Sequence, residues 1–192
     1  MMDRSAYLEE VIKGAKAVDP EQLSLFIDAL ESAYRESRAV FVIGNGGSAA
    51  NASHFAQDLA KGTMVDVERQ TPFKVMSLTD NVSAMTALAN DIGYDRVFDL
   101  PLRQHAVSGD LLVAISGSGN SPNIVRAAAF AREAGIRVAG VTGFDGGQLM
   151  PLSDIKVHVP LMDMCKSEAV HAILFHLVAD ELRERFSDGD TA

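Results

Sequence analysis

The sequence is poor in cysteine, in tryptophan and in positive charge. It has one cysteine, Cys165, and no tryptophan among 192 residues. A single cysteine cannot form an intrachain disulfide, so the chain is not cross-linked as small secreted domains are. Lys and Arg number 17 against 26 Asp and Glu, which gives a net charge of -9. Because nucleic acids and anionic membranes bind cationic surfaces, this deficit argues against both partners.

Long hydrophobic runs are also missing. No uninterrupted apolar segment approaches the roughly 20 residues that a membrane-spanning helix needs. The first ten residues, MMDRSAYLEE, lack the apolar centre of a secretory signal peptide. With 47% hydrophobic residues, a chain of 192 residues can bury a full core. We therefore expect one domain over residues 1–192, in the cytoplasm.

Apolar runs of strand length alternate with helical patterns along most of the chain. Continuous apolar runs are typical of parallel strands that are covered on both faces. The alternation predicts an α/β fold with a doubly wound parallel sheet, whose ligands bind at the carboxyl ends of the strands. The expected strands lie near 39–43, 73–77, 110–115, 136–141 and 155–159.

Amphipathic helices are expected on both sides of this region. Residues 1–36 would form an N-terminal extension of two helices, with Asp19 as N-cap and Pro20 in the first turn of the second helix. A last helix over about 166–186 would complete the core of residues 37–186. The N-terminal helices precede the sheet and are apolar on one face, so we expect oligomerisation to cover them.

Two of the expected strands end in loops of small and hydroxyl residues. Residues 44–48 read GNGGS and residues 116–121 read SGSGNS, and each loop precedes an alanine-rich helical stretch. The first amides of a helix lack partners and bind anions, and serine hydroxyls add donors. Neither loop contains Lys or Arg, so the pattern favours a compact phosphate. The alternatives are tight turns without a ligand and a dinucleotide site, although a third glycine is missing soon after Gly46.

Candidates for metal binding and proton transfer lie on two of the expected helices. His54 and Asp58 are four residues apart, so they project from one helical face. Glu168 and His176 are eight residues apart on the last helix and can share a face. Two imidazoles and two carboxylates would suit Zn²⁺. The alternative is a surface pair of His54 and Asp58, with His176 packed in the core.

Four blocks of the sequence resemble SIS (sugar isomerase) domain proteins, and within them the phosphoheptose isomerase subgroup. The blocks are residues 44–50, 89–94, 115–121 and 142–147, in this order. The resemblance implies a five-stranded, flavodoxin-like parallel sheet in a homotetramer, with active sites at subunit interfaces. It implies isomerisation of a sugar phosphate, foremost sedoheptulose 7-phosphate. The positions that it assigns to substrate binding are Asn45, Gly46, Gly47, Ser48, Asn90, Asp91, Ser116, Gly117, Ser118 and Ser121.

The same resemblance implies a zinc site. These isomerases carry a His-x-x-x-Glu on the helix after the first loop and a Gln with a following His on the last helix. The matching metal ligands here are His54, Asp58, Glu168 and His176. Asp58 is therefore one methylene shorter than the family residue, and Glu168 adds a negative charge. Other departures from the family pattern are Gly117 in place of Thr, Lys61-Gly62 in place of Gly-Arg, and Cys165-Lys166.

An aldose–ketose isomerase must move one proton between adjacent carbons and another between oxygens. We assign the carbon base to Asp58 or Glu168 and the acid/base partner to His176. His171 falls on another face of the last helix, so we expect it to be structural. A second hypothesis is a non-catalytic SIS tetramer that binds proteins, like the DnaA-binding regulator of the DiaA type. A third is a sugar-phosphate sensor module.

Overall fold

Five parallel strands form the centre of the molecule. The computed structural model describes residues 3–189, so the predicted domain of residues 1–192 includes residues 1–2 and 190–192, which lie outside the described part. The sheet has the order β2-β1-β3-β4-β5, which confirms the predicted doubly wound, flavodoxin-like fold. The strands are β1 (Val40–Ile43), β2 (Val75–Ser77), β3 (Leu111–Ser116), β4 (Arg137–Thr142) and β5 (Ile155–His158).

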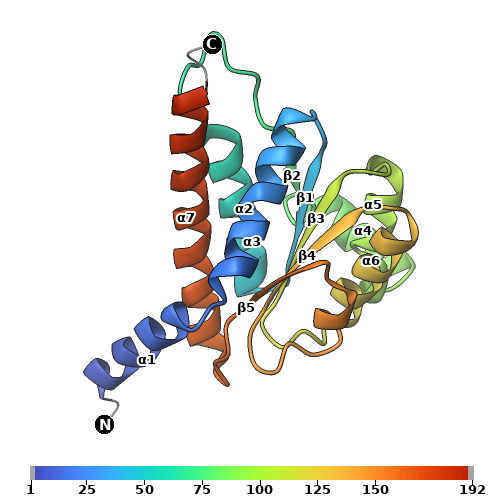
Figure 1. Ribbon diagram of the computed structural model, residues 1–192. Coiled ribbons are helices and arrows are strands. Elements are labelled where there is room, and N and C mark those ends of the chain that lie inside the picture. The colour runs from blue at the N-terminus through green and yellow to red at the C-terminus, as the bar shows by residue number, and fades with distance from the viewer. Residues whose placement is uncertain (1–2, 190–192) are drawn as a thin grey trace.

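Helices cover both faces of this sheet (Figure 1). One layer consists of α2 (Pro20–Arg35), α3 (Gly47–Gln57) and α7 (Met164–Gly189), and the other of α4 (Val82–Asp91), α5 (Asp99–His105) and α6 (Pro122–Glu133). Three short helical turns are η1 (Asp58–Gly62), η2 (Tyr94–Arg96) and η3 (Met150–Leu152). Among residues 3–189, no helix is long and apolar enough to cross a membrane.

The central strand β3 explains why the apolar run at this place is unbroken. All six of its residues are buried. Successive side chains of a strand point to opposite faces. Leu111 and Val113 accordingly join the core under α2, α3 and α7, whereas Leu112 and Ala114 join the core under α5 and α6.

The two loops rich in glycine and serine follow β1 and β3. Strands are added on one side of the sheet from β1 to β2 and on the other side from β3 to β5, so these loops lie where the order of the strands reverses. β1 and β3 are hydrogen-bonded neighbours, and their registers place Ile43 opposite Ala114. After β1 the chain enters α3 on one face, and after β3 it enters α6 on the other face (Figure 1). Such a switch point leaves a crevice between two outgoing loops. Both loops lie at the carboxyl ends of the strands, as the sequence predicted, and the fold places them beside each other.

The N-terminal helix α1 (Arg4–Lys16) projects away from the sheet and contacts the first part of α7 (Figure 1). The Asp3 side chain caps it by accepting hydrogen bonds from the amides of Ser5 and Ala6. Lys166 on α7 forms an ion pair with Glu10 on α1. The next helix, α2, begins as predicted, with Asp19 as N-cap and Pro20 as its first residue.

Candidate functional site

The loop after β3 brings together serines that were predicted to bind a phosphate. Ser116 ends the strand and Ser121 is the N-cap of α6. The Ser116 hydroxyl donates to the Ser121 hydroxyl over 3.4 Å. The Ser118 hydroxyl accepts from the amide of Asn120, over 3.2 Å. The Ser121 side chain forms no capping bond within the described structure, so its hydroxyl hydrogen can still be donated to a ligand at the start of α6.

Two glycines of this loop lie close to other segments, and at Gly119 the backbone itself requires glycine. Gly119 has a φ of +67°, and a Cβ there would collide with the carbonyl oxygen of Gly146. A Cβ at Gly117 would collide with the sulfur of Met164, at the start of α7. Gly117 is the position at which the family resemblance implies a Thr. The loss of that hydroxyl removes one possible ligand contact.

The loop after β1 is tied to α6 through amide side chains. Asn45 and Asn123 exchange two hydrogen bonds, each of 2.9 Å. The Tyr94 hydroxyl donates to the same Asn45 oxygen over 2.8 Å. Gly46 follows as the N-cap of α3 with a φ of +56°, and Ser48 in the first turn is buried. Asn123 and Tyr94 were not predicted as functional, although a polar residue among the alanines of α6 is a signal that could have found the first.

Asn90 and Asp91 end helix α4 and are both exposed. The Asn90 amide donates to the Asp91 carboxylate over 2.7 Å. Three residues further on, Tyr94 joins this segment to Asn45 of the first loop. The predicted substrate residues of the second sequence block, Asn90 and Asp91, are therefore linked to the first loop through Tyr94, and their role stays a prediction.

Three of the four predicted metal ligands lie together. One nitrogen each of His54 and His176 and one Asp58 oxygen all lie within 4.8 Å of one another. The distances from Asp58 Oδ2 to His54 Nε2 and to His176 Nδ1 are both 3.6 Å. The carboxylate is 16% exposed, while the two imidazoles are 53% and 57% exposed. The group can offer a cation two nitrogen donors and one oxygen donor.

Packing between α3 and α7 positions this group. The residue that follows His54 and the residue that precedes His176 are phenylalanines, Phe55 and Phe175, whose rings stack at 4.3 Å. The two imidazole rings meet edge to face at 4.9 Å. Asp58 begins η1, a π-helical turn in which the Thr63 amide donates to the Asp58 carbonyl. Such turns are common at functional sites, and the sequence pattern did not reveal this one.

Glu168, the fourth predicted ligand, lies elsewhere. It is not part of the group just described, and its carboxylate packs against Gly47, where an added Cβ would collide with it. Asn51 donates to the Glu168 carbonyl over 3.0 Å, which joins the N-terminal parts of α3 and α7. Gly47 is seven residues from His54, or about 10 Å along α3. In this arrangement the Glu168 charge faces the helix start rather than the two imidazoles.

The other histidines of the described chain have different surroundings. His171 is fully buried, its Nε2 lies 3.1 Å from the Thr142 carbonyl, and burial lowers its pKa to about 4. These properties fit the structural role predicted for it. Burial also lowers the pKa of His158, whose Nδ1 is 3.0 Å from the Thr142 hydroxyl. His105 is exposed at the end of α5.

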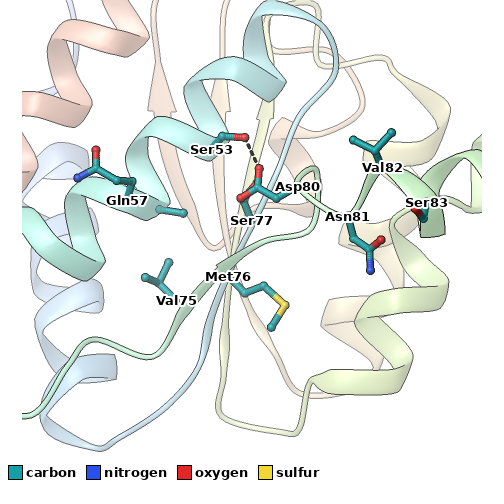
Figure 2. Close-up of a pocket in the computed structure, with 10 residues that line it drawn as sticks. Ser53, Gln57, Val75, Met76, Ser77, Asp80, Asn81, Val82 and Ser83 are labelled. Carbon is teal, nitrogen blue, oxygen red and sulfur yellow. Dashed lines mark hydrogen bonds between the residues drawn. The ribbon is translucent and has the colours of Figure 1, made fainter.

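A cavity of about 740 Å³ lies beside α3, at the end of β2 (Figure 2). Figure 2 shows Ser53 of α3 bonded to Asp80, and the Ser53 hydroxyl also lies 3.0 Å from that of Thr79. None of the residues predicted to bind substrate or metal lines this cavity. Because the predicted imidazoles are more than half exposed, one chain by itself does not enclose them.

Comparison with known proteins identifies the family of this chain. The SIS domain family model matches residues 5–143. The phosphoheptose isomerase of Mycobacterium tuberculosis (strain ATCC 25177 / H37Ra) is 41% identical over 155 residues, which cover 81% of this chain and 78% of that protein.

Solved structures of phosphoheptose isomerases show the same architecture. The GmhA structure from Neisseria gonorrhoeae has a TM-score of 0.84 and 30% identity, covering 93% of this chain and 95% of its own. The structure from Francisella tularensis has a TM-score of 0.86 and 27% identity, covering 94% of both chains. The chain therefore belongs to the SIS domain family, in its phosphoheptose isomerase subgroup.

Proposed function

We propose that this chain interconverts sedoheptulose 7-phosphate, or a close analogue, and D-glycero-D-manno-heptose 7-phosphate, with the assistance of Zn²⁺. Membership of the phosphoheptose isomerase subgroup makes it a sugar-phosphate isomerase. The observation that supports the assistance of Zn²⁺ is the group of His54, Asp58 and His176. We further propose that residues 1–192 act as one SIS domain in a cytoplasmic homotetramer, since a phosphorylated substrate does not cross a bilayer unaided.

The donor set of this group fits a catalytic zinc ion. Two imidazole nitrogens and one carboxylate oxygen are ligands that Zn²⁺ takes, and three protein ligands leave a position for substrate. A fourth ligand from Glu168 would close the site, which is typical of structural zinc. A cation bound by His54, Asp58 and His176 would polarise the sugar carbonyl and stabilise the charge of an enediolate.

The protein residues supply proton transfer and anchoring. The Asp58 carboxylate is within reach of both imidazoles and can take a proton from the carbon beside the carbonyl and return it to the next carbon. His176 can move a proton between the two substrate oxygens, and Glu168 remains the second candidate for the carbon base. The phosphate does not react. Its contacts with the loop after β3 would hold the sugar so that its carbonyl end is correctly placed.

The test combines metal content with activity on sedoheptulose 7-phosphate. We expect divalent metal in protein purified without chelator, and loss of isomerisation on treatment with EDTA. His176→Ala should lower metal content and reduce the rate by about 100-fold or more, as expected when an acid/base group is lost. His105→Ala removes an exposed imidazole on α5 and is the matched control.

Two outcomes would contradict the proposal in different ways. Full activity in metal-free protein would leave Asp58 and His176 as a metal-free acid/base pair. A folded protein that isomerises none of the ketose 7-phosphates tested would favour a SIS tetramer that binds proteins.

A further inference from the structure

The side chain of Asn45 is held by three hydrogen bonds from two other elements. Its oxygen accepts from Asn123 Nδ2 at 2.9 Å and from the Tyr94 hydroxyl at 2.8 Å. Its nitrogen donates to Asn123 Oδ1 at 2.9 Å. Asn123 belongs to the first turn of α6 and is 2% exposed. A loop residue is thus bound to a buried side chain on a rigid helix.

A backbone amide fixes the orientation of both side chains. The amide of Ile124 lies 3.0 Å from Asn123 Oδ1. An amide N–H can only donate, so the atom that faces it must be the oxygen of Asn123. The nitrogen of Asn123 then faces Asn45, and the Asn45 atom that it meets must be an oxygen. Only this placement of the oxygen and nitrogen atoms in the two side chains allows both hydrogen bonds between Asn45 and Asn123.

The assignment decides what Asn45 can offer to a ligand. A carbonyl oxygen has two lone pairs, and the oxygen of Asn45 uses both, toward Asn123 and Tyr94. Its amide group has two hydrogens, of which one is used toward Asn123. One N–H remains. Asn45 can therefore donate to an oxygen of a phosphate, carbonyl or hydroxyl group, and it cannot accept from a ligand.

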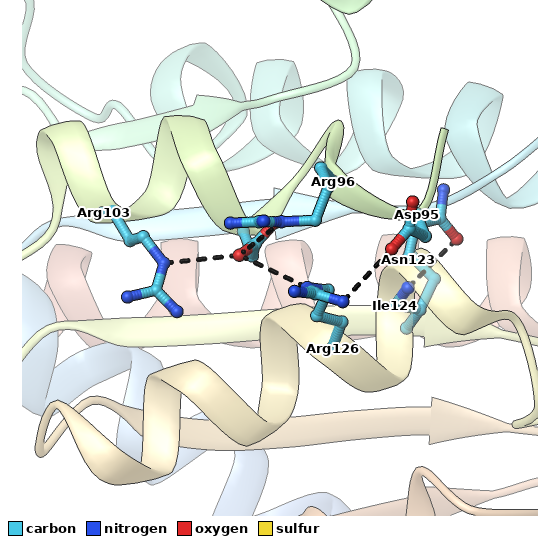
Figure 3. A network of polar contacts seen from close by, with 7 residues as sticks. Asp95, Arg96, Arg103, Asn123, Ile124 and Arg126 are labelled. Atoms are coloured by element: carbon cyan, nitrogen blue, oxygen red, sulfur yellow. Dashed lines mark hydrogen bonds and ion pairs between the residues drawn. The ribbon is translucent and has the colours of Figure 1, made fainter. Parts of the chain in front are cut away.

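Ion pairs fix the η2 turn, which contains Tyr94, to α6. Figure 3 shows Arg126 of α6 reaching Asp95, the residue after Tyr94, with a distance of 3.1 Å. Arg126 also forms an ion pair with the fully buried Asp99, at 3.6 Å. Arg96 pairs with the same carboxylate at 2.9 Å. Burial raises the pKa of Asp99, but hydrogen bonds from arginines outweigh it and hold the pKa below its usual value. The η2 turn is thereby fixed to α6.

We infer that Asn123 and Tyr94 are positioning residues, which hold Asn45 as a hydrogen-bond donor toward the sugar phosphate. This inference rests on the proposed function, because Asn45 is a predicted substrate residue. Neither Asn123 nor Tyr94 needs to touch the substrate. Their effect on binding should act entirely through Asn45, and this requirement makes the inference testable.

A double-mutant cycle tests the dependence on Asn45. The affinity for sedoheptulose 7-phosphate would be measured by calorimetry for Asn123→Ala, Tyr94→Phe and Asn45→Ala, and for each of the first two combined with Asn45→Ala. Tyr94→Phe removes one hydroxyl from a side chain that is 53% exposed, so it keeps the fold even if Asn123→Ala does not. Tyr34→Phe on α2 is the matched control.

We expect Asn123→Ala, which removes two hydrogen bonds to Asn45, to weaken binding about tenfold, and Tyr94→Phe, which removes one, to weaken it about threefold. In the Asn45→Ala background both changes should fall below about twofold. Equal losses with and without Asn45 would overturn the inference, since the residues would then act through the fold.

A ligand-free crystal structure of the Tyr94→Phe and Asn123→Ala variants separates this inference from the proposed function. The Asn45 amide should leave its place in Asn123→Ala, and an unmoved amide in both variants would overturn the inference. If the wild-type protein binds no sugar phosphate, the proposed function fails, while these structures still decide whether Asn123 and Tyr94 position Asn45.

Discussion

Glu168 places a negative charge where a bound anion would meet it. Its carboxylate packs against Gly47 in the first turn of α3. Unpaired amides and the helix dipole favour an anion at such a helix start. The side chain thus occupies a position that would suit part of an anionic ligand. The Gln that the family resemblance implies at this position would lack this charge.

Exchanging this charge is the first prediction at the scale of single residues. Glu168→Gln should keep the bound metal, because His54, Asp58 and His176 remain. It should also bind sugar phosphate several-fold more tightly, since a like charge is removed. Elemental analysis and calorimetry at two salt concentrations measure both effects. Glu184→Gln, an exposed change on the same helix, is the control. Loss of metal in Glu168→Gln alone would show that Glu168 is a ligand after all.

The buried His171 predicts how stability responds to acid. Its pKa is about 4 in the folded chain and about 6.5 when unfolded. Between these values the unfolded chain binds the extra proton, so this residue destabilises the fold as pH falls from about 6.5 to 4. Over the whole range this effect lowers the free energy of unfolding by about 3 kcal/mol. His171→Gln cannot take up this proton, so its free energy of unfolding should fall less steeply over that range in urea titrations. Parallel pH profiles for the two proteins would contradict this account.

At the scale of elements, the serine loop and the start of α6 form the expected anion site. Ser121→Ala removes a hydroxyl that no capping bond occupies in the described structure, so the helix should stay intact. Sugar-phosphate binding should weaken by about 1–2 kcal/mol, through the loss of one charge-assisted hydrogen bond. Calorimetry measures this change, with Ser24→Ala on α2 as control. Unchanged affinity in a folded variant would place the phosphate elsewhere.

Which elements could be predicted depended on the range of the interactions that form them. The strands and the outer helices follow from local apolar patterns, and the pairing of His54 with Asp58 follows from helical spacing. The π-helical turn after α3, which contains the buried Leu59, has no such local pattern. The rotamer of Glu168 depends on its neighbour Gly47, which is distant in sequence. Contacts of this kind leave no periodic signal.

At the scale of the whole molecule, apolar side chains remain uncovered on two helices. On α1, Leu8 and Ile12 are 60% and 54% exposed, and on α7, Ile173 and Leu177 are 48% and 44% exposed. Ile173 and Leu177 flank His176 in sequence. A second copy of the chain that covers these side chains would also cover the exposed imidazoles of the proposed metal site. The predicted tetramer and the predicted interface site therefore depend on the same surface.

Changing α1 tests this dependence. The wild-type protein should sediment as a tetramer at micromolar concentration, and removal of residues 1–18 should lower the oligomeric state or the solubility. That deletion also uncovers part of α7.

The double variant Leu8→Glu with Ile12→Glu is therefore the cleaner change, because both side chains already face solvent in a single chain. It should dissociate the tetramer by burying charge at an interface, and isomerase activity should fall with it. Val107→Glu, at a residue that is 61% exposed beyond α5, is the control and should remain tetrameric. A wild-type protein that sediments as a monomer would rule out both the tetramer and an active site built between subunits.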